Sequence, residues 1–203
     1  MAAAPQVICL GEALVDRLGP LGGDPATAPP EQCDDRLGGA PANVACGLAR
    51  LGTASAFVGR LGLDPIGEAF TQLLRQQGVD LSALQHDSTR PSRIVLVRRD
   101  AGGDRSFGGF AGDRGEGFAD QALDAKALQA SLPPLLAEAR WLQVGTIPLA
   151  TAASAEALRL ALGLAADASV PLALDVYWRP PSGLRMRPRM QAHRLRPRQR
   201  CNP

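Results

Sequence analysis

The stretch from Gly38 to Gly62, GGAPANVACGLARLGTASAFVGRLG, constrains the fold more than any other part of the chain. Two glycines open it, and Pro41 then suits a first helical turn, because the N–H that proline lacks would be unpaired there. Gly52 can end the helix in a left-handed conformation. The sequence therefore predicts a glycine turn that leads into a helix, and the first turn of this helix carries one polar side chain, Asn43.

The beginning of this helix suits a polar or anionic ligand. Free backbone N–H groups and the positive end of the helix dipole meet at a helix N-terminus. A tight turn followed by a buried helix would give the same local pattern, because a single glycine-rich turn is a weak signal. Ligand binding and simple packing therefore both stay open on local chemistry alone.

Composition excludes several classes of site. The 203 residues are enough for one substantial core. The single lysine, Lys126, follows Ala125, so the chain has no Walker A phosphate-binding motif. Two histidines and four cysteines without CxxC or HExxH spacing give no basis for a metal site. The N-terminus has no basic signal region and the apolar parts have no uncharged 18-residue run, so we expect a cytoplasmic protein without a membrane segment.

Charge divides the chain into two parts. Residues 1–180 carry 15 basic and 20 acidic side chains, whereas residues 181–203 carry seven arginines and no acid. The second part is also rich in proline and has no apolar periodicity, so it has too few apolar side chains to order itself. We predict a folded domain over 1–180 and a basic Arg/Pro-rich tail over 181–203, either disordered or translated out of frame.

Strand and helix patterns alternate in the first half of the chain. Val7–Leu10 is a short apolar run, and we expect a first central strand that ends in a carboxylate, Asp16. Ala54–Gly59 predicts a second strand, and Asp64 and Pro65 are a good pair to start a helix. This order predicts an α/β fold with a mostly parallel sheet and helices on both faces.

The second half continues with further strands and helices. Ser92–Arg99 and Arg105–Phe110 flank a turn and predict an antiparallel pair. Leu123–Glu138 predicts a helix in two pieces, broken at Pro133-Pro134. Pro171–Val176 predicts another core strand, just before the change in composition.

The spacing of small residues in the opening stretch resembles the N-terminal signature of the PfkB carbohydrate kinases, which are ribokinase-like sugar kinases. The matching positions are Gly38, Gly39, Pro41, Asn43, Ala45, Gly52 and Gly62. The resemblance covers roughly residues 6–180. It implies a Rossmann-type, mostly parallel sheet flanked by helices and a small β lid, with the C-terminal part of the fold missing.

The resemblance also implies a set of sugar-binding residues, namely Asp16, Gly38, Gly39, Asn43, Phe107 and Arg179. GEALVD at 11–16 resembles the first strand of the family, and Glu12 in it favours the fructokinases over the adenosine kinases. A polyol site fits these residue types, because carboxylate and amide groups can hold neighbouring hydroxyls and glycines let a sugar ring approach the backbone.

The family phosphorylates sugars with ATP and Mg²⁺, and this chain lacks the matching part. A later Gly-Ala-Gly-Asp segment supplies the family's catalytic aspartate and the anion hole, and it does not occur here. The similarity of GFAGD at 109–113 to this segment is superficial, because GFAGD follows a hairpin. Asp113 is therefore not assigned to catalysis. Tyr177 stands where the family has an asparagine on the nucleotide side. We therefore predict no catalytic residue.

Three functions follow as hypotheses. The first is a fructokinase-like kinase by family, with little or no activity in this truncated chain. The second is a non-catalytic sugar-binding protein or a nucleic-acid binder that uses the arginine tail, although the tail lacks aromatic stacking residues. The third is the same fold with another substrate, such as ribose or a keto-deoxy sugar acid. The expected partners are a small-molecule sugar and a second copy, through the lid.

Overall fold

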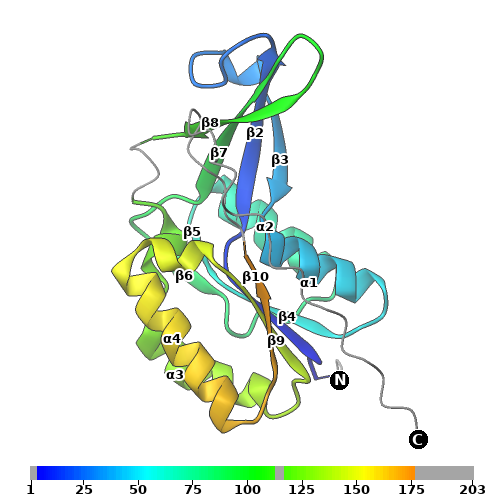
Figure 1. Cartoon of the computed structure of the whole chain (residues 1–203), viewed down its shortest axis with the longest axis vertical. Helices are drawn as coiled ribbons and strands as arrows, with labels where there is room; N and C mark the ends of the chain where they lie inside the picture. The colour runs from blue at the N-terminus through cyan, green and yellow to red at the C-terminus, as the bar shows by residue number, and fades with distance from the viewer. Residues whose placement is uncertain (1–3, 113–116, 177–203) are drawn as a thin grey trace, which may run out of the picture.

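Two β-sheets organise the protein (Figure 1). The computed structural model describes residues 4–112 and 117–176. The larger sheet has the order β10-β9-β1-β4, and all its strands are parallel. These strands are β1 (Val7–Leu10), β4 (Ser55–Val58), β9 (Trp141–Gly145) and β10 (Leu172–Asp175).

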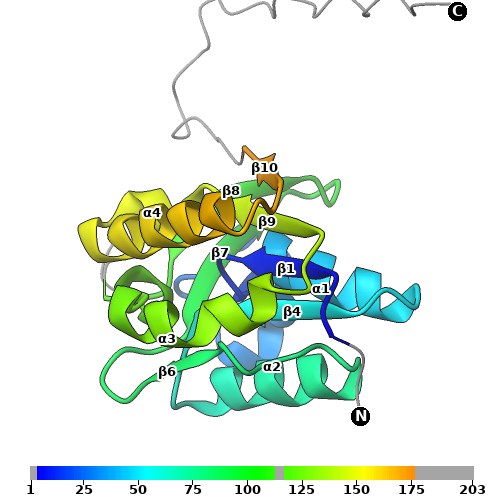
Figure 2. The ribbon, with the colours of Figure 1, turned by 90° about the horizontal axis from the view of Figure 1, so that it is seen from below.

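Helices cover both faces of the larger sheet (Figure 2). They are α1 (Ala40–Arg50) and α2 (Pro65–Gln76) on one face and α3 (Ala125–Leu136) and α4 (Ala152–Asp167) on the other. Alternate residues of β1 serve the two layers, because Ile8 and Leu10 pack with α3 and α4, whereas Cys9 packs with α1 and α2. The predicted parallel sheet with two helical layers is confirmed.

The smaller sheet projects from one end of the larger one and is called the lid here (Figure 1). Its order is β3-β2-β7-β8, where β2–β7 is parallel and the two outer pairs are antiparallel. The strands are β2 (Leu14–Leu21), β3 (Asp34–Gly38), β7 (Arg93–Arg99) and β8 (Arg105–Phe110). The antiparallel pair predicted over Ser92–Phe110 is confirmed. A short helix, η1 (Pro30–Gln32), lies between β2 and β3.

The chain passes from the larger sheet into the lid within three residues, Gly11–Ala13. A glycine starts this connection, and its open side is packed by Pro41, because a Cβ at Gly11 would lie 2.6 Å from the Pro41 Cγ. Asp16 therefore lies inside the lid strand β2 and not at the end of a central strand. The prediction of one central strand ending at Asp16 is wrong, since the sequence pattern does not reveal the change of sheet.

Two further predictions are wrong in their packing. The helix α3 continues through Pro133 and Pro134. The prolines lie exposed in its last turns, and the neighbouring Leu132 and Leu135 are buried, so tertiary packing holds the helix together. The predicted core strand β10 is an edge strand, since it pairs only with β9 among the described residues and leaves Leu174 61% exposed.

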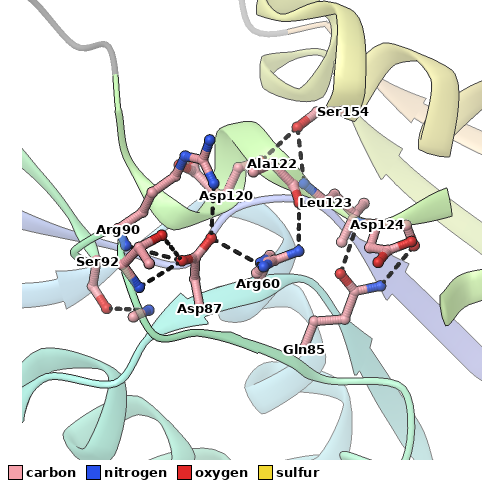
Figure 3. Close-up of polar contacts among 12 residues, drawn as sticks. Arg60, Gln85, Asp87, Arg90, Ser92, Asp120, Ala122, Leu123, Asp124 and Ser154 are labelled. Carbon is pink, nitrogen blue, oxygen red and sulfur yellow. Dashed lines mark hydrogen bonds and ion pairs between the residues drawn. The ribbon is translucent and has the colours of Figure 1, made fainter. Parts of the chain in front are cut away.

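A polar network fixes the base of the lid to the helical body (Figure 3). It surrounds β5 (Arg60–Gly62), β6 (Gln85–Asp87) and η2 (Ala119–Ala122). Arg60 donates to the Ala122 carbonyl at 2.8 Å and pairs with Asp87 at 3.1 Å. The Ser154 hydroxyl of α4 donates to the Asp120 carbonyl at 2.7 Å. These contacts hold η2 against α4 on one side and against β5 and β6, which form the base of the lid, on the other.

The buried ion pair of Arg93 and Asp120 completes the base. The guanidinium donates to both carboxylate oxygens, at 2.8 and 3.1 Å, and both side chains are about 5% exposed. Arg93 begins β7, so the pair holds the first residue of a lid strand on η2. A short helix, η3 (Ile147–Ala150), precedes α4. Across residues 4–112 and 117–176, every helix is too short or too polar to cross a lipid bilayer.

Candidate sugar-binding site

Asp16 and Gly38 lie side by side on the lid strands β2 and β3. In their antiparallel register Leu14 faces Gly38 and Asp16 faces Arg36. A Cβ at Gly38 would lie 3.2 Å from the Asp16 Oδ2. The absence of a side chain at residue 38 thus leaves room for the Asp16 carboxylate. The two residues are 22 positions apart, and the strand register brings them together.

Gly39 connects β3 to α1 and needs to be glycine for two reasons. Its φ of +100° is strained for residues with a side chain. A Cβ there would also lie only 2.6 Å from the Glu12 carbonyl oxygen. The predicted glycine turn into a helix is confirmed, and Gly52 beyond the end of α1 has the predicted left-handed backbone, with a φ of +84°.

Asn43 lies one helical turn beyond Gly39. Its backbone N–H donates to the Gly39 carbonyl at 2.9 Å, and its side chain is exposed. The structure thus joins four of the six predicted residues, Asp16, Gly38, Gly39 and Asn43, in one continuous unit of β2, β3 and the start of α1. This unit presents a carboxylate, an amide and bare glycine backbone.

Glu12 is a buried part of the same unit that sequence reasoning used only as a marker of a subgroup. Its side chain is 3% exposed, and its Oε1 accepts a hydrogen bond from the Ala40 N–H at 3.2 Å. Its Oε2 has no partner among the described residues. Burial raises the pKa of Glu12 to about 7, against the lowering effect of the backbone N–H groups. A carboxylate directly after a buried strand was the available signal.

Phe107 lies on β8, where it is 39% exposed and contacts the ring of Phe110, with centroids 5.2 Å apart. Phe110 is the aromatic residue in line with Asp16, because Val95 of β7 is paired with both of them. Sequence reasoning missed Phe110, since the register shift within β7–β8 cannot be read from the residue order. The Arg93 guanidinium lies 5.3 Å from the centre of the Phe110 ring.

Three residues named from the sequence lie outside the described part of the chain. They are Asp113, Tyr177 and the predicted sugar contact Arg179. The structure therefore says nothing about their position relative to Asp16.

The helix start in this unit is partly occupied. The first N–H of α1, that of Ala40, already donates to the Glu12 carboxyl and is not available to a phosphate. In residues 4–112 and 117–176 no group of three or more His, Cys, Asp or Glu side chains is arranged to hold a metal ion.

A separate cavity of about 480 Å³ lies beside the start of α2. It contains none of the predicted sugar contacts. Its carboxylate, Asp64, is already used as the helix cap, since it accepts from the Gly67 N–H at 2.7 Å and from the Ser92 N–H and hydroxyl. The Asp64 carboxylate of this cavity therefore serves the fold, as predicted for the helix cap.

Comparison with known proteins decides the family. The profile of the pfkB family carbohydrate kinases matches residues 4–196. The chain belongs to this family. Solved ribokinase-like structures share its fold, with a parallel sheet flanked by helices. The predicted boundary at residue 180 is not tested by this match and stays a prediction.

Named relatives of the chain are fructokinases. It is 43% identical over 106 residues to a fructokinase of Escherichia coli, a region that covers 50% of this chain and 31% of the relative. It is 36% identical over 161 residues to a fructokinase of Klebsiella pneumoniae, covering 76% and 47%. A fructokinase of Xylella fastidiosa, solved with bound ATP, superposes with a TM-score of 0.71 at 29% identity, covering 88% and 52%. The chain thus spans about half the length of these proteins or less.

Proposed function

We propose that this chain provides the sugar-binding part of a fructokinase-like kinase, and that its substrate is fructose. The observation that carries this proposal is the contact between Gly38 and the Asp16 carboxylate at the start of α1, with Asn43 one turn away. The match of the chain to fructokinases supports the choice of sugar.

In this proposal each residue has a separate task. The Asp16 carboxylate accepts hydrogen bonds from two neighbouring hydroxyls, and the Asn43 amide both donates and accepts. Gly38 and Gly39 let the sugar ring lie against the backbone, and Phe107 covers its apolar face. Arg179 is proposed as a further hydroxyl contact from beyond the described residues. Together these contacts orient one hydroxyl for transfer.

Phosphoryl transfer is proposed for the family and not for these 203 residues by themselves. In the family, ATP and Mg²⁺ supply the phosphoryl group and neutralise its charge. The Ala40 N–H at the start of α1 is already taken by Glu12, and the sequence contains no Gly-Ala-Gly-Asp segment. We therefore expect sugar binding without turnover at ordinary kinase rates.

Calorimetric titration with fructose and with ribose tests the proposal. We expect fructose to bind, and Asp16→Asn to weaken its binding by about tenfold, because a carboxylate acceptor is lost. Asp35→Asn is the matched control, since Asp35 is an exposed carboxylate on the neighbouring strand β3. Absence of fructose binding, or equal binding by Asp16→Asn, would refute it. ADP release from Mg-ATP and fructose at several turnovers per second would refute the expected lack of transfer.

We also propose that two copies associate through the lid. An exposed apolar side chain on an outer strand of the lid supports this, since Leu37 of β3 is 37% exposed. Analytical ultracentrifugation should show a dimer, and Leu37→Glu should produce monomers. A wild-type chain that sediments as a monomer would contradict the proposal.

A reducing cytoplasm is the proposed location. The three cysteines within the described residues, Cys9, Cys33 and Cys46, are free thiols. Such thiols persist in reducing compartments. Recovery of the protein in a non-cytoplasmic cell fraction would contradict this location.

A further inference from the structure

The Glu12 carboxyl joins two segments that are 28 residues apart in the chain. It lies in the connection between β1 and β2, and its Oε1 accepts a hydrogen bond from the Ala40 N–H, the first residue of α1. The side chain is 3% exposed. Its second oxygen has no hydrogen-bond partner among the described residues, so the bond from Ala40 is the contact that ties this carboxyl to α1.

Three glycines leave the space in which the Glu12 segment and the start of α1 approach each other. A Cβ at Gly145, the last residue of β9, would lie 3.3 Å from the Glu12 Oε2. A Cβ at Gly11 would lie 2.6 Å from the Pro41 Cγ, and one at Gly39 would lie 2.6 Å from the Glu12 carbonyl oxygen. Close approach at three glycines presses the start of α1 against the Glu12 segment. The carboxyl is thus enclosed by the turn that carries the proposed sugar contacts.

We propose that Glu12 is a positioning residue of the sugar site, which fixes the Gly38–Gly39 turn against Asp16 by accepting the Ala40 N–H hydrogen bond. This inference rests on the proposed function for the identity of the ligand. Glu12 itself does not touch the sugar. It acts because displacement of Ala40 moves Gly38 and Gly39 together, and residue 38 lies so close to Asp16 that a Cβ there would be 3.2 Å from the Asp16 Oδ2.

Two variants of nearly equal size separate positioning from stability. Glu12→Gln keeps an oxygen acceptor for the Ala40 N–H, whereas Glu12→Met fills the same space and offers none. Glu12→Met also removes a buried carboxyl with an unpaired oxygen, so we expect it to fold at least as stably as the wild type. Glu68→Met, at an exposed carboxylate on α2, is the matched control.

The first measurement is hydrogen exchange of the Ala40 amide in the full chain, followed by NMR. Its protection should fall about tenfold in Glu12→Met and stay within about threefold in Glu12→Gln and Glu68→Met. Unchanged protection in Glu12→Met would overturn the inference, whether or not the chain binds a sugar. This readout is therefore independent of the proposed function.

The second measurement is the affinity for fructose. We expect Kd to rise about tenfold in Glu12→Met and to be restored to within about threefold by Glu12→Gln, without a parallel change in thermal stability. Equal affinity of the wild type and Glu12→Met would overturn the positioning role. A wild type that binds no sugar would instead refute the proposed function, and the Ala40 exchange would then decide the inference on its own.

Discussion

The buried carboxylates at the base of the lid and at the glycine turn differ in how fully their oxygens are hydrogen-bonded. Both oxygens of Asp120 accept hydrogen bonds from Arg93. Asp87 is buried, which alone would raise its pKa, but bonds from Thr89 and Arg90 outweigh this and hold the pKa below its usual range. Glu12 accepts from the Ala40 N–H and has an unpaired second oxygen, and burial raises its pKa to about 7 against the lowering effect of backbone N–H groups.

This difference separates stability from function. Fully paired buried charges hold two parts of a protein in one arrangement, and breaking such a pair is costly. An incompletely paired buried carboxyl destabilises the folded state and persists where its position has a use. The paired charges at the base of the lid therefore favour rigidity, whereas the Glu12 turn carries a buried carboxyl that reduces stability; on the proposed function, this carboxyl positions the sugar site.

The largest effect is expected at the lid base. Asp120→Ala leaves the Arg93 guanidinium buried without its partner and should reduce the free energy of unfolding by about 3–5 kcal/mol. Urea denaturation measures this loss. Asp35→Ala, which breaks the partly exposed pair with Arg17, is the control and should cost about 0–1 kcal/mol. Equal losses of unfolding free energy in the two variants would show that the buried pair contributes no more than the partly exposed one.

The next effect has the opposite sign and depends on pH. The folded protein holds the Glu12 proton up to about pH 7, whereas an unfolded glutamate loses it near 4.5. Wild-type stability should therefore fall as the pH rises through this window and stay low above it. Glu12→Gln removes this loss and should stabilise the protein by about 3 kcal/mol above pH 7.

Two neighbouring charges also shift the pKa of Glu12. Asp120 raises it and Arg93 lowers it. Urea denaturation across this pH range checks the prediction. A constant difference between Glu12→Gln and the wild type at every pH would show that the carboxyl does not titrate in this window.

A smaller effect tests the backbone of the turn. Gly39→Ala forces a side chain onto a φ of +100° and against the Glu12 carbonyl, and should cost about 2 kcal/mol. Gly47→Ala is the matched variant, because it lies inside α1 with open space around it. That change should stabilise the helix by about 0.5–1 kcal/mol. Thermal unfolding that gave the same sign for both would contradict the special role of residue 39.

The smallest effect on stability is expected at Gly38. Gly38→Ala places a methyl group 3.2 Å from the Asp16 Oδ2, so the carboxylate has to shift by a few tenths of an ångström. Stability should change by less than about 1 kcal/mol, whereas fructose affinity should fall roughly tenfold. Calorimetry on the same samples measures the affinity. Unaltered binding would separate the sugar site from the contact between Gly38 and Asp16.

The sequence predicted those parts of the fold that depend on local signals. These parts are the glycine turn into α1, the Asp64 cap of α2 and the order of strands and helices. Each depends on residues that are neighbours in the sequence. It failed at Pro133 and Pro134, because the burial of nearby leucines outweighs helix propensity. It also failed for β10, whose exposure depends on what lies beside it in space.

The residues of the candidate site could be named from the sequence but their connections could not, and their role in sugar binding stays a prediction. Asp16, Gly38, Gly39 and Asn43 were named from the motif, and the strand register brings them into one unit. The bond between Glu12 and Ala40 spans 28 residues and leaves no periodic pattern in the sequence. Phe110 was missed because its alignment with Asp16 passes through a third strand, β7.

The continuous segment that runs from β1 through the lid strands β2 and β3 into α1 has a consequence for the order of folding. Residues 7–50 contain Glu12, Asp16, the two glycines and Asn43, so most of the described candidate contacts lie in one continuous segment, whereas Phe107 comes later, on β8. Contacts between residues close in the chain form early, because little loop entropy is lost. As the segment leaves the ribosome before β7 and the helices α2 to α4, the turn at Gly38 and Gly39 can form before the sheet that supports it is complete.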